Sequence, residues 1–166
     1  MTGEIDLTDW IREAHQFEHF QDGTAYLIEK HGGGTNDSGV FRDGEMIELA
    51  TIGRSRAKAK IARTAGGAWL HGADTANAIG GMGSPISVWS RTGYATREDA
   101  IDAARRECRE YFKRETVSTN SCLTDGMRTE AFKMVEALSP KEPAAQMSLF
   151  ELLATPAVPS RSTLEP

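Results

Sequence analysis

The fold is decided by residues 54–71, whose sequence is RSRAKAKIARTAGGAWLH. Side chains alternate between two kinds over residues 57–65, which is the period of a strand with two different faces. Gly66-Gly67 is a turn signal, and residues 68–71 resume as a second strand. The stretch therefore predicts two antiparallel strands at the centre of the fold.

The chain after this stretch predicts the rest of a β-meander and the helices that close it. A strand is expected from Ile86 to Gly93. Thr96 then opens a helix over residues 96–113, followed by Asp99 in an arrangement close to a capping box. A final helix is expected over residues 124–138. The predicted class is α+β, a small antiparallel sheet with the first helix packed across one face and the terminal helix beside it. The apolar stripe of the first helix consists of Ile101, Ala104, Cys108, Tyr111 and Phe112.

The residues before the central stretch predict shorter elements. Apolar side chains recur at helical spacing over residues 7–20, and Gln21-Asp22-Gly23 is expected to end that helix. The elements expected next are a strand over 24–29, a glycine-rich loop over 32–39 and a short hairpin over 40–49 around Asp43-Gly44.

Composition predicts one domain and one tail. A length of 166 residues fits a single domain, which we expect to span residues 4–138. Five of the six prolines fall in residues 139–166, where they are mixed with Ala, Ser and Thr. Such a segment buries too little apolar surface to order itself, so a flexible tail is predicted there.

The sequence also indicates a compartment. The polar, acidic start of the chain does not have the pattern of a signal peptide, and no stretch reaches the length of an apolar membrane span. Two cysteines are too few for a disulfide scaffold. A cytoplasmic protein without membrane contact is therefore expected.

Charge is distributed unevenly along the chain, although the net charge is only −5. Residues 1–50 hold three basic and 11 acidic side chains, whereas residues 51–114 hold 12 basic and six acidic ones. The acidic front and the basic middle could attract each other within the fold. Alternatively, the basic part marks a surface that meets a polyanion.

Four cations occupy every second position of the central stretch, and we call Arg54, Arg56, Lys58 and Lys60 the basic ladder. On a strand, the ladder would form one face, with small and apolar side chains on the other. Such a face suits contacts to the phosphates of nucleic acid, independent of base sequence. The alternatives are a solvated outer face and an edge strand whose charges prevent aggregation.

The tail contains the sequence QMSLFELL at residues 146–153. Gln146, Ser148, Leu149 and Phe150 match the peptide with which bacterial replication and repair proteins dock on the DNA sliding clamp, and the tail resembles that peptide. The resemblance implies that the amide of Gln146 bonds to the rim of a pocket that Leu149 and Phe150 fill. The alternative is a helical turn that folds back onto the domain.

Two further motifs suggest catalytic chemistry. His15-Gln16-Phe17-Glu18-His19 has the H-x-x-E-H order of inverted zinc peptidases, and a helix would place both histidines on one face. Residues 80–84, GGMGS, do not have the Lys-Ser/Thr ending of a phosphate-binding loop, so a turn or hairpin tip is expected. We expect no cofactor and no covalent catalyst.

These observations favour an accessory protein of bacterial, phage or plasmid DNA metabolism. It would dock on the sliding clamp through its tail, and the basic ladder would contact DNA or a second protein. Two alternatives remain open. The first is a mobile-element modulator whose acidic front binds and titrates a host protein. The second is a small metal-dependent hydrolase that uses His15, Glu18 and His19.

Overall fold

The computed structural model describes residues 3–140 and has four helices and six strands in that range. The α+β class is thereby confirmed. Within these residues, no helix is long and apolar enough to cross a membrane. The elements, in chain order, are β1 Glu4–Asp6, α1 Thr8–Ala14, α2 Phe20–His31, β2 Glu45–Ile52, β3 Ser55–Arg63, β4 Trp69–Ala76, β5 Gly81–Gly83, β6 Thr92–Tyr94, α3 Arg97–Val117 and α4 Asp125–Ala137.

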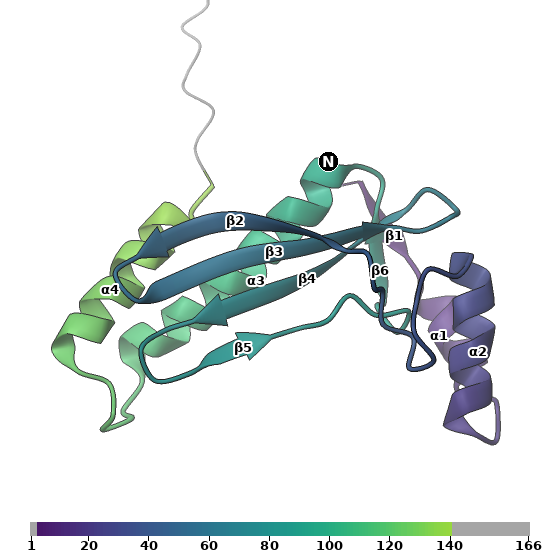
Figure 1. Ribbon diagram of the computed structural model, residues 1–166, viewed down its shortest axis with the longest axis horizontal. Helices are drawn as coiled ribbons and strands as arrows, with labels where there is room; N and C mark the ends of the chain where they lie inside the picture. The colour runs from purple at the N-terminus through teal and green to yellow at the C-terminus, as the bar shows by residue number, and fades with distance from the viewer. Residues whose placement is uncertain (1–2, 141–166) are drawn as a thin grey trace, which may run out of the picture.

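All strand pairs are antiparallel, and the main path through the sheet is β1-β6-β4-β3-β2, with β5 beside β4 (Figure 1). The three long strands β2, β3 and β4 lie side by side, with β2 at one edge of the sheet. Ile61 pairs with His71 across β3 and β4, which confirms the two antiparallel strands predicted from residues 54–71.

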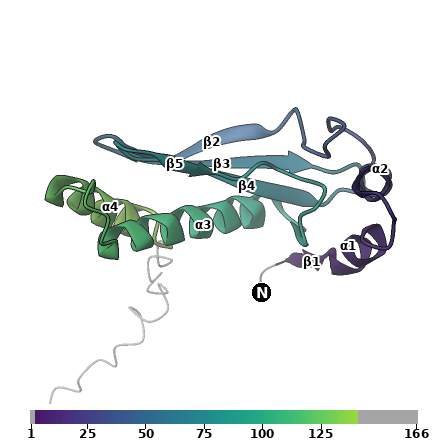
Figure 2. The same ribbon diagram turned by 90° about the horizontal axis from the view of Figure 1, so that it is seen from below.

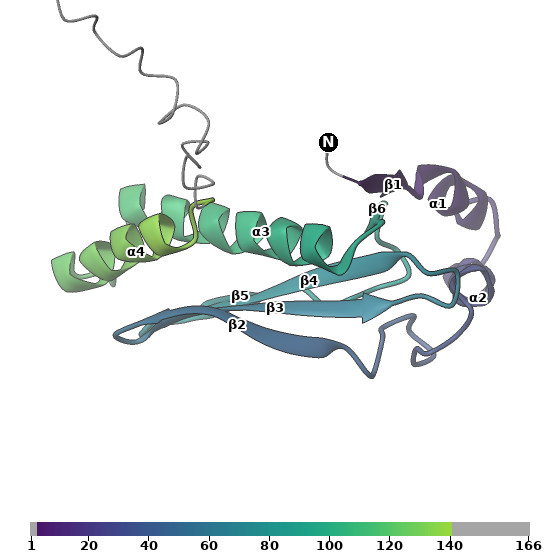
Figure 3. The same ribbon diagram turned by 90° about the horizontal axis from the view of Figure 1, so that it is seen from above.

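The helices α3 and α4 lie together on one face of this sheet (Figures 2 and 3). Small side chains at Ala57 and Ala73 let α3 approach closely, and they share a buried cluster with Cys108 and Phe112. The hydroxyl of Thr96 accepts a hydrogen bond from the backbone N–H of Asp99 at 3.1 Å, which caps α3 as predicted. The predicted packing of both helices on one face is confirmed.

The helices α1 and α2 form a separate hairpin beyond the end of the long strands, far from α4 (Figure 1). A Cβ atom at Gly23 would lie 2.4 Å from the carbonyl oxygen of Ala14, so the close crossing of the two helices requires glycine. His31 is buried at the end of α2, and its Nε2–H donates a hydrogen bond to the backbone carbonyl oxygen of Val88 at 3.2 Å. Burial lowers the pKa of His31, and its bond to Val88 partly offsets that effect.

Two predictions for this hairpin were wrong. The helix expected over 7–20 ends at Ala14, and Gln21-Asp22-Gly23 lies inside α2 instead of ending a helix. The strand expected over 24–29 is the middle of α2. Its buried side chains, Thr24, Leu27 and His31, follow helical spacing, which a six-residue window cannot separate from strand alternation.

Two predictions about the sheet were also wrong. The hairpin expected over 40–49 is absent, because β2 begins only at Glu45 and pairs with β3 around Gly53-Arg54. The strand expected from Ile86 to Gly93 is reduced to a single bridge at Ser87 and to the start of β6. Buried side chains, not strand hydrogen bonds, hold most of this segment, because Ile86 and Val88 pack into two different clusters of the core.

Candidate nucleic-acid interface

Three members of the basic ladder lie on the face of the sheet opposite α3 and α4, which we call the open face. Arg56, Lys58 and Lys60 alternate along β3 with four buried residues, so they project from the other side of the strand. Figure 3 shows both helices on one side of β2, β3 and β4; in the part of the chain that the structure describes, no helix lies over the ladder on the other side. The buried residues are Ser55, Ala57, Ala59 and Ile61.

Two carboxylates share the open face with these cations. Glu48 of β2 and Asp74 of β4 both lie opposite Lys58 in the register of the sheet. The ammonium nitrogen of Lys60 lies 3.3 Å from a carboxylate oxygen of Asp74. Among residues 3–140, no ion pair joins Arg54, Arg56 or Lys58 to a carboxylate, so most of the ladder keeps its positive charge for a ligand.

The remaining member of the ladder, Arg54, lies in the turn between β2 and β3. Gly53 has φ of +59°, a left-handed conformation that favours glycine, and this residue forms the tight turn. The carboxylate of Glu130 in α4 accepts hydrogen bonds from the backbone N–H of Arg54 and from the hydroxyl of Ser55, both at 3.2 Å. The turn is thus anchored to α4 through its backbone, and the exposed side chain of Arg54 extends the ladder to the end of the sheet.

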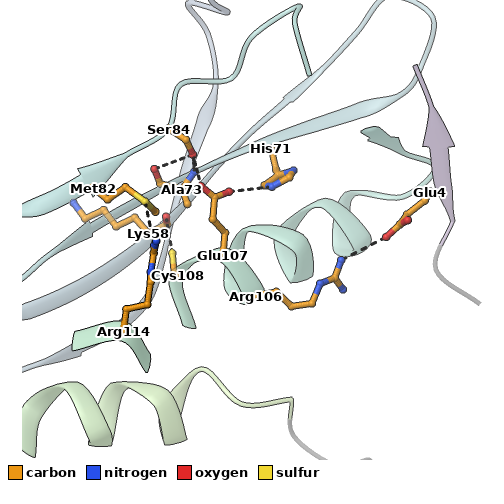
Figure 4. A network of polar contacts seen from close by, with 10 residues as sticks. All are labelled: Glu4, Lys58, His71, Ala73, Met82, Ser84, Arg106, Glu107, Cys108 and Arg114. Carbon is orange, nitrogen blue, oxygen red and sulfur yellow. Dashed lines mark hydrogen bonds and ion pairs between the residues drawn. The ribbon is translucent and has the colours of Figure 1, made fainter. Parts of the chain in front are cut away.

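Beneath the sheet, a polar network joins β4 to α3 (Figure 4). Glu107 accepts a hydrogen bond from Ser84 at 2.9 Å, and its other oxygen lies 3.3 Å from Nε2 of His71. The hydrogen bond from His71 is the main cause that lowers the pKa of Glu107. The bond from Ser84 lowers this pKa further, whereas burial raises it. The hydroxyl of Ser84 also accepts the backbone N–H of Ala73 at 2.7 Å. Glu107 lies between Ser84 and His71, so these two residues do not form a catalytic serine–histidine pair. The network instead holds Ser84 against the sheet.

The two cysteines lie in contrasting environments. Cys108 is fully buried, and its thiol lies 3.7 Å from the carbonyl oxygen of Lys58 (Figure 4). Burial raises the pKa of Cys108 to about 11, so this thiol stays protonated at neutral pH and is a poor nucleophile. Cys122 is exposed in the segment between α3 and α4.

The structure contradicts the helical geometry on which the metal-dependent hydrolase depended. The helix α1 ends at Ala14, His15 is its C-cap, and His19 is the N-cap of α2. His15 and His19 therefore do not share the face of one helix. The His15 ring packs against Trp89, with the ring centroids 5.1 Å apart. Within residues 3–140, no group of three or more His, Cys, Asp or Glu side chains is arranged to hold a metal ion.

Sequence reasoning missed an aromatic surface on the α1–α2 hairpin. Phe20 is 63% exposed and stacks on Trp89 with a centroid distance of 4.9 Å and an angle of 8°. Phe17, 45% exposed, packs against Tyr26, whose hydroxyl bonds to the carboxylate of Glu13. The sequence predicted a single helix over residues 7–20, whereas the chain breaks between Ala14 and Phe20 and leaves Phe17 and Phe20 exposed.

The sliding-clamp residues Gln146, Ser148, Leu149 and Phe150 lie outside the described residues. The candidate interface thus consists of the basic ladder at the open face of a sheet whose other face is covered by helices. No family model, no curated protein and no solved structure matches the chain.

Proposed function

We propose that this chain is an accessory protein of bacterial, phage or plasmid DNA metabolism that acts in the cytoplasm. Its open face contacts the phosphate backbone of nucleic acid, and its tail peptide docks on the DNA sliding clamp. The observation that carries the first part is that Arg54 and Arg56 are exposed, Lys58 is half-buried beside them, and none of the three forms an ion pair with a carboxylate among residues 3–140.

The spacing of the ladder fits a phosphate backbone. Side chains on one face of a strand recur every ~6.6 Å, so Arg56, Lys58 and Lys60 form a row roughly 13 Å long. Successive phosphates of one DNA strand advance about 3.4 Å along the helix axis, so the row spans several phosphates. Long cationic side chains on a flat face position a backbone without selecting bases. The proposed contact is therefore independent of sequence and sensitive to salt.

The experiment that tests this contact is fluorescence anisotropy of a labelled 20-base-pair duplex, titrated with the full chain at low salt. The variant Arg54→Gln/Arg56→Gln/Lys58→Gln removes three charges from the open face, and we expect at least about tenfold weaker binding, which is about 1.4 kcal/mol. The matched control, Arg42→Gln/Arg91→Gln/Lys133→Gln, removes three exposed charges elsewhere. Equal losses in the two variants would show that only net charge matters and would refute the interface.

The tail part of the proposal rests on the peptide chemistry of residues 146–153. Its test is anisotropy of a labelled peptide spanning Pro140 to Pro156, titrated with a bacterial sliding clamp. We expect micromolar binding that is abolished when Leu149 and Phe150 are both changed to Ala. Binding that survives this change would refute the anchor roles.

The aromatic surface supports the modulator as a second candidate function. Phe17 and Phe20 are exposed within a hairpin that also carries Glu13, Glu18 and Asp22. Exposed aromatic patches with a charged rim are typical of protein-binding surfaces. If the hairpin binds and titrates a host protein, Glu18→Lys/Asp22→Lys should abolish inhibition of that host protein. DNA binding by the open face should remain. Unchanged inhibition in that variant would remove it.

A further inference from the structure

A groove of about 810 Å³ lies where the edge strand β2, the helix α3 and the end of α4 meet. Leu49 and Ala137 supply apolar surface to it. The helix α3 supplies the cations Arg105, Arg106 and Arg109 and the carboxylates Asp102 and Glu110. Ser139 and Pro140, the last two described residues, line the same groove. The chain therefore leaves the described domain from within the groove.

An irregularity in β2 opens the groove on its sheet side. The register between β2 and β3 shifts between Glu48 and Ala50, and Leu49 has no partner residue in β3. β2 is also the end strand of the sheet path, so its outer edge is unpaired among the described residues. This bulge leaves Leu49 half-buried, against the cluster that contains Phe112 and Leu138, and the rest of its side chain faces the groove.

A buried donor in the groove has no acceptor. The Nε atom of Arg109 is buried and makes no hydrogen bond within the described residues. Its neighbours on α3 are paired, since Arg105 contacts Asp102 and Arg106 lies 3.7 Å from Glu4. An unsatisfied buried donor costs free energy that an incoming carboxylate or carbonyl oxygen recovers. The groove thus combines apolar surface with one cation in need of an acceptor.

We infer that this groove binds the tail peptide of the same chain, residues 146–153, in competition with the sliding clamp. The chain from Pro140 to Gln146 is six residue-to-residue steps long and reaches at most about 20 Å, which allows the peptide to lie along the groove at a high effective concentration. Leu149 and Phe150 would fill the space beside Leu49 and Ala137. The carboxylate of Glu151, directly after the anchors, is the acceptor that Arg109 requires.

This inference deepens the proposed function, and its regulatory meaning rests on clamp binding by the same peptide. A peptide that is docked on its own domain nine-tenths of the time binds an external partner about tenfold more weakly than the free peptide. The groove would therefore hold the protein off the clamp until a ligand of the groove or a high local clamp concentration releases the tail.

The test is ¹H–¹⁵N NMR of the full chain without any clamp. We compare the wild type with Leu149→Ala/Phe150→Ala and with a matched tail variant, Leu164→Ala, which lies outside the motif. We expect the double variant to shift the backbone signals of Leu49, Arg109 and Ala137 and the Nε–H signal of Arg109, while Leu164→Ala leaves them in place. Superimposable spectra of the wild type and the double variant at these positions would overturn the inference.

A second measurement separates failure of this inference from failure of the proposed function. The clamp affinity of the full chain is compared with that of the isolated peptide from Pro140 to Pro156. We expect the full chain to bind about tenfold more weakly. Tail-dependent NMR shifts without clamp binding would refute the clamp role alone. Equal clamp affinities together with unshifted spectra would refute the groove and leave the clamp role intact.

Discussion

The two faces of the central sheet are built from alternate residues of the same strands and have opposite properties. On the covered face, Ala57, Ala59 and Ile61 are fully buried beneath the helices. On the open face, Arg56 and Lys58 lie beside them in sequence without a carboxylate partner among residues 3–140. The covered face thus buries apolar surface against the helices, whereas Arg56 and Lys58 make no ion pair that would tie them to the rest of the described residues.

The acidic front contributes one carboxylate to the open face, Glu48, which lies opposite Lys58 without forming an ion pair among residues 3–140. Two ion pairs in the same range join acids of the first 50 residues to bases of the middle, Glu45 to Arg97 and Glu4 to Arg106. Both bases lie on α3, on the other side of the sheet from the ladder. The attraction within the fold that the charge pattern allowed thus involves α3, and the ladder stays available.

The largest effect is expected on the covered face. Phe112→Ala removes a fully buried ring from the cluster beneath α3 and α4 and should lower the free energy of unfolding by roughly 3–5 kcal/mol. Phe132→Ala makes the same change at a 57% exposed position of α4 and should cost less than about 1 kcal/mol. Urea unfolding measures both. Similar losses would contradict the packing described for the covered face.

A smaller effect is expected at Gly72 of β4, which lies opposite Lys60 in the register of the sheet. A Cβ atom at Gly72 of β4 would lie 2.4 Å from the backbone carbonyl oxygen of Ser84, so Gly72→Ala should cost roughly 1–3 kcal/mol through displacement of that segment. Gly83→Ala is the control, because a Cβ atom there meets nothing within 4 Å. Thermal unfolding compares the two variants. If Gly72→Ala leaves the thermal stability unchanged, residues 84–86 do not pack against the sheet as described.

The polar network under the covered face predicts a dependence of stability on pH. Hydrogen bonds, first from His71, lower the pKa of Glu107 in the folded state below its ordinary value near 4.5. The ionised carboxylate thus stabilises the fold above that value, and the contribution is lost as the pH falls through the folded pKa. We expect Glu107→Gln to flatten the loss of stability between neutral and acidic pH. A slope unchanged from that of the exposed control Glu136→Gln would contradict this role.

The smallest effect on stability is expected from the ladder. Arg54→Gln/Arg56→Gln/Lys58→Gln removes exposed charges that have no ion-pair partner among residues 3–140, and the free energy of unfolding should change by less than about 0.5 kcal/mol. Urea unfolding at moderate salt measures this change. A loss of several kcal/mol would mean that the ladder has a structural role.

The central strands and the helices α3 and α4 could be predicted because their local signals agree with the global fold. The alternation over 57–65 and the Gly66-Gly67 turn both indicate a pair of strands, and the Thr96 cap indicates the start of a helix. The placement of the ladder on one face followed from the same alternation. The position of Glu48 and Asp74 beside the ladder could not be predicted in this way, because it depends on the register of three strands.

The first half of the chain could not be predicted as well, because its structure depends on tertiary contacts. Residues 24–29 satisfy both strand and helix patterns, and the packing of Leu27 and Val88 in one cluster selects the helix. The strand β1 consists of three residues, and its partner, β6, lies almost 90 residues later. The groove beside Leu49 requires a bulge that no sequence pattern marks.

The measurement that tests the central claim most directly is the salt dependence of duplex DNA binding by the full chain. If the ladder contacts about three phosphates, the logarithm of the association constant should fall against the logarithm of salt concentration with a slope of roughly −3. The glutamine variant of Arg54, Arg56 and Lys58 should bring that slope close to zero, and the control variant of Arg42, Arg91 and Lys133 should keep it. The same slope in the wild type and the ladder variant would contradict an interface on the open face.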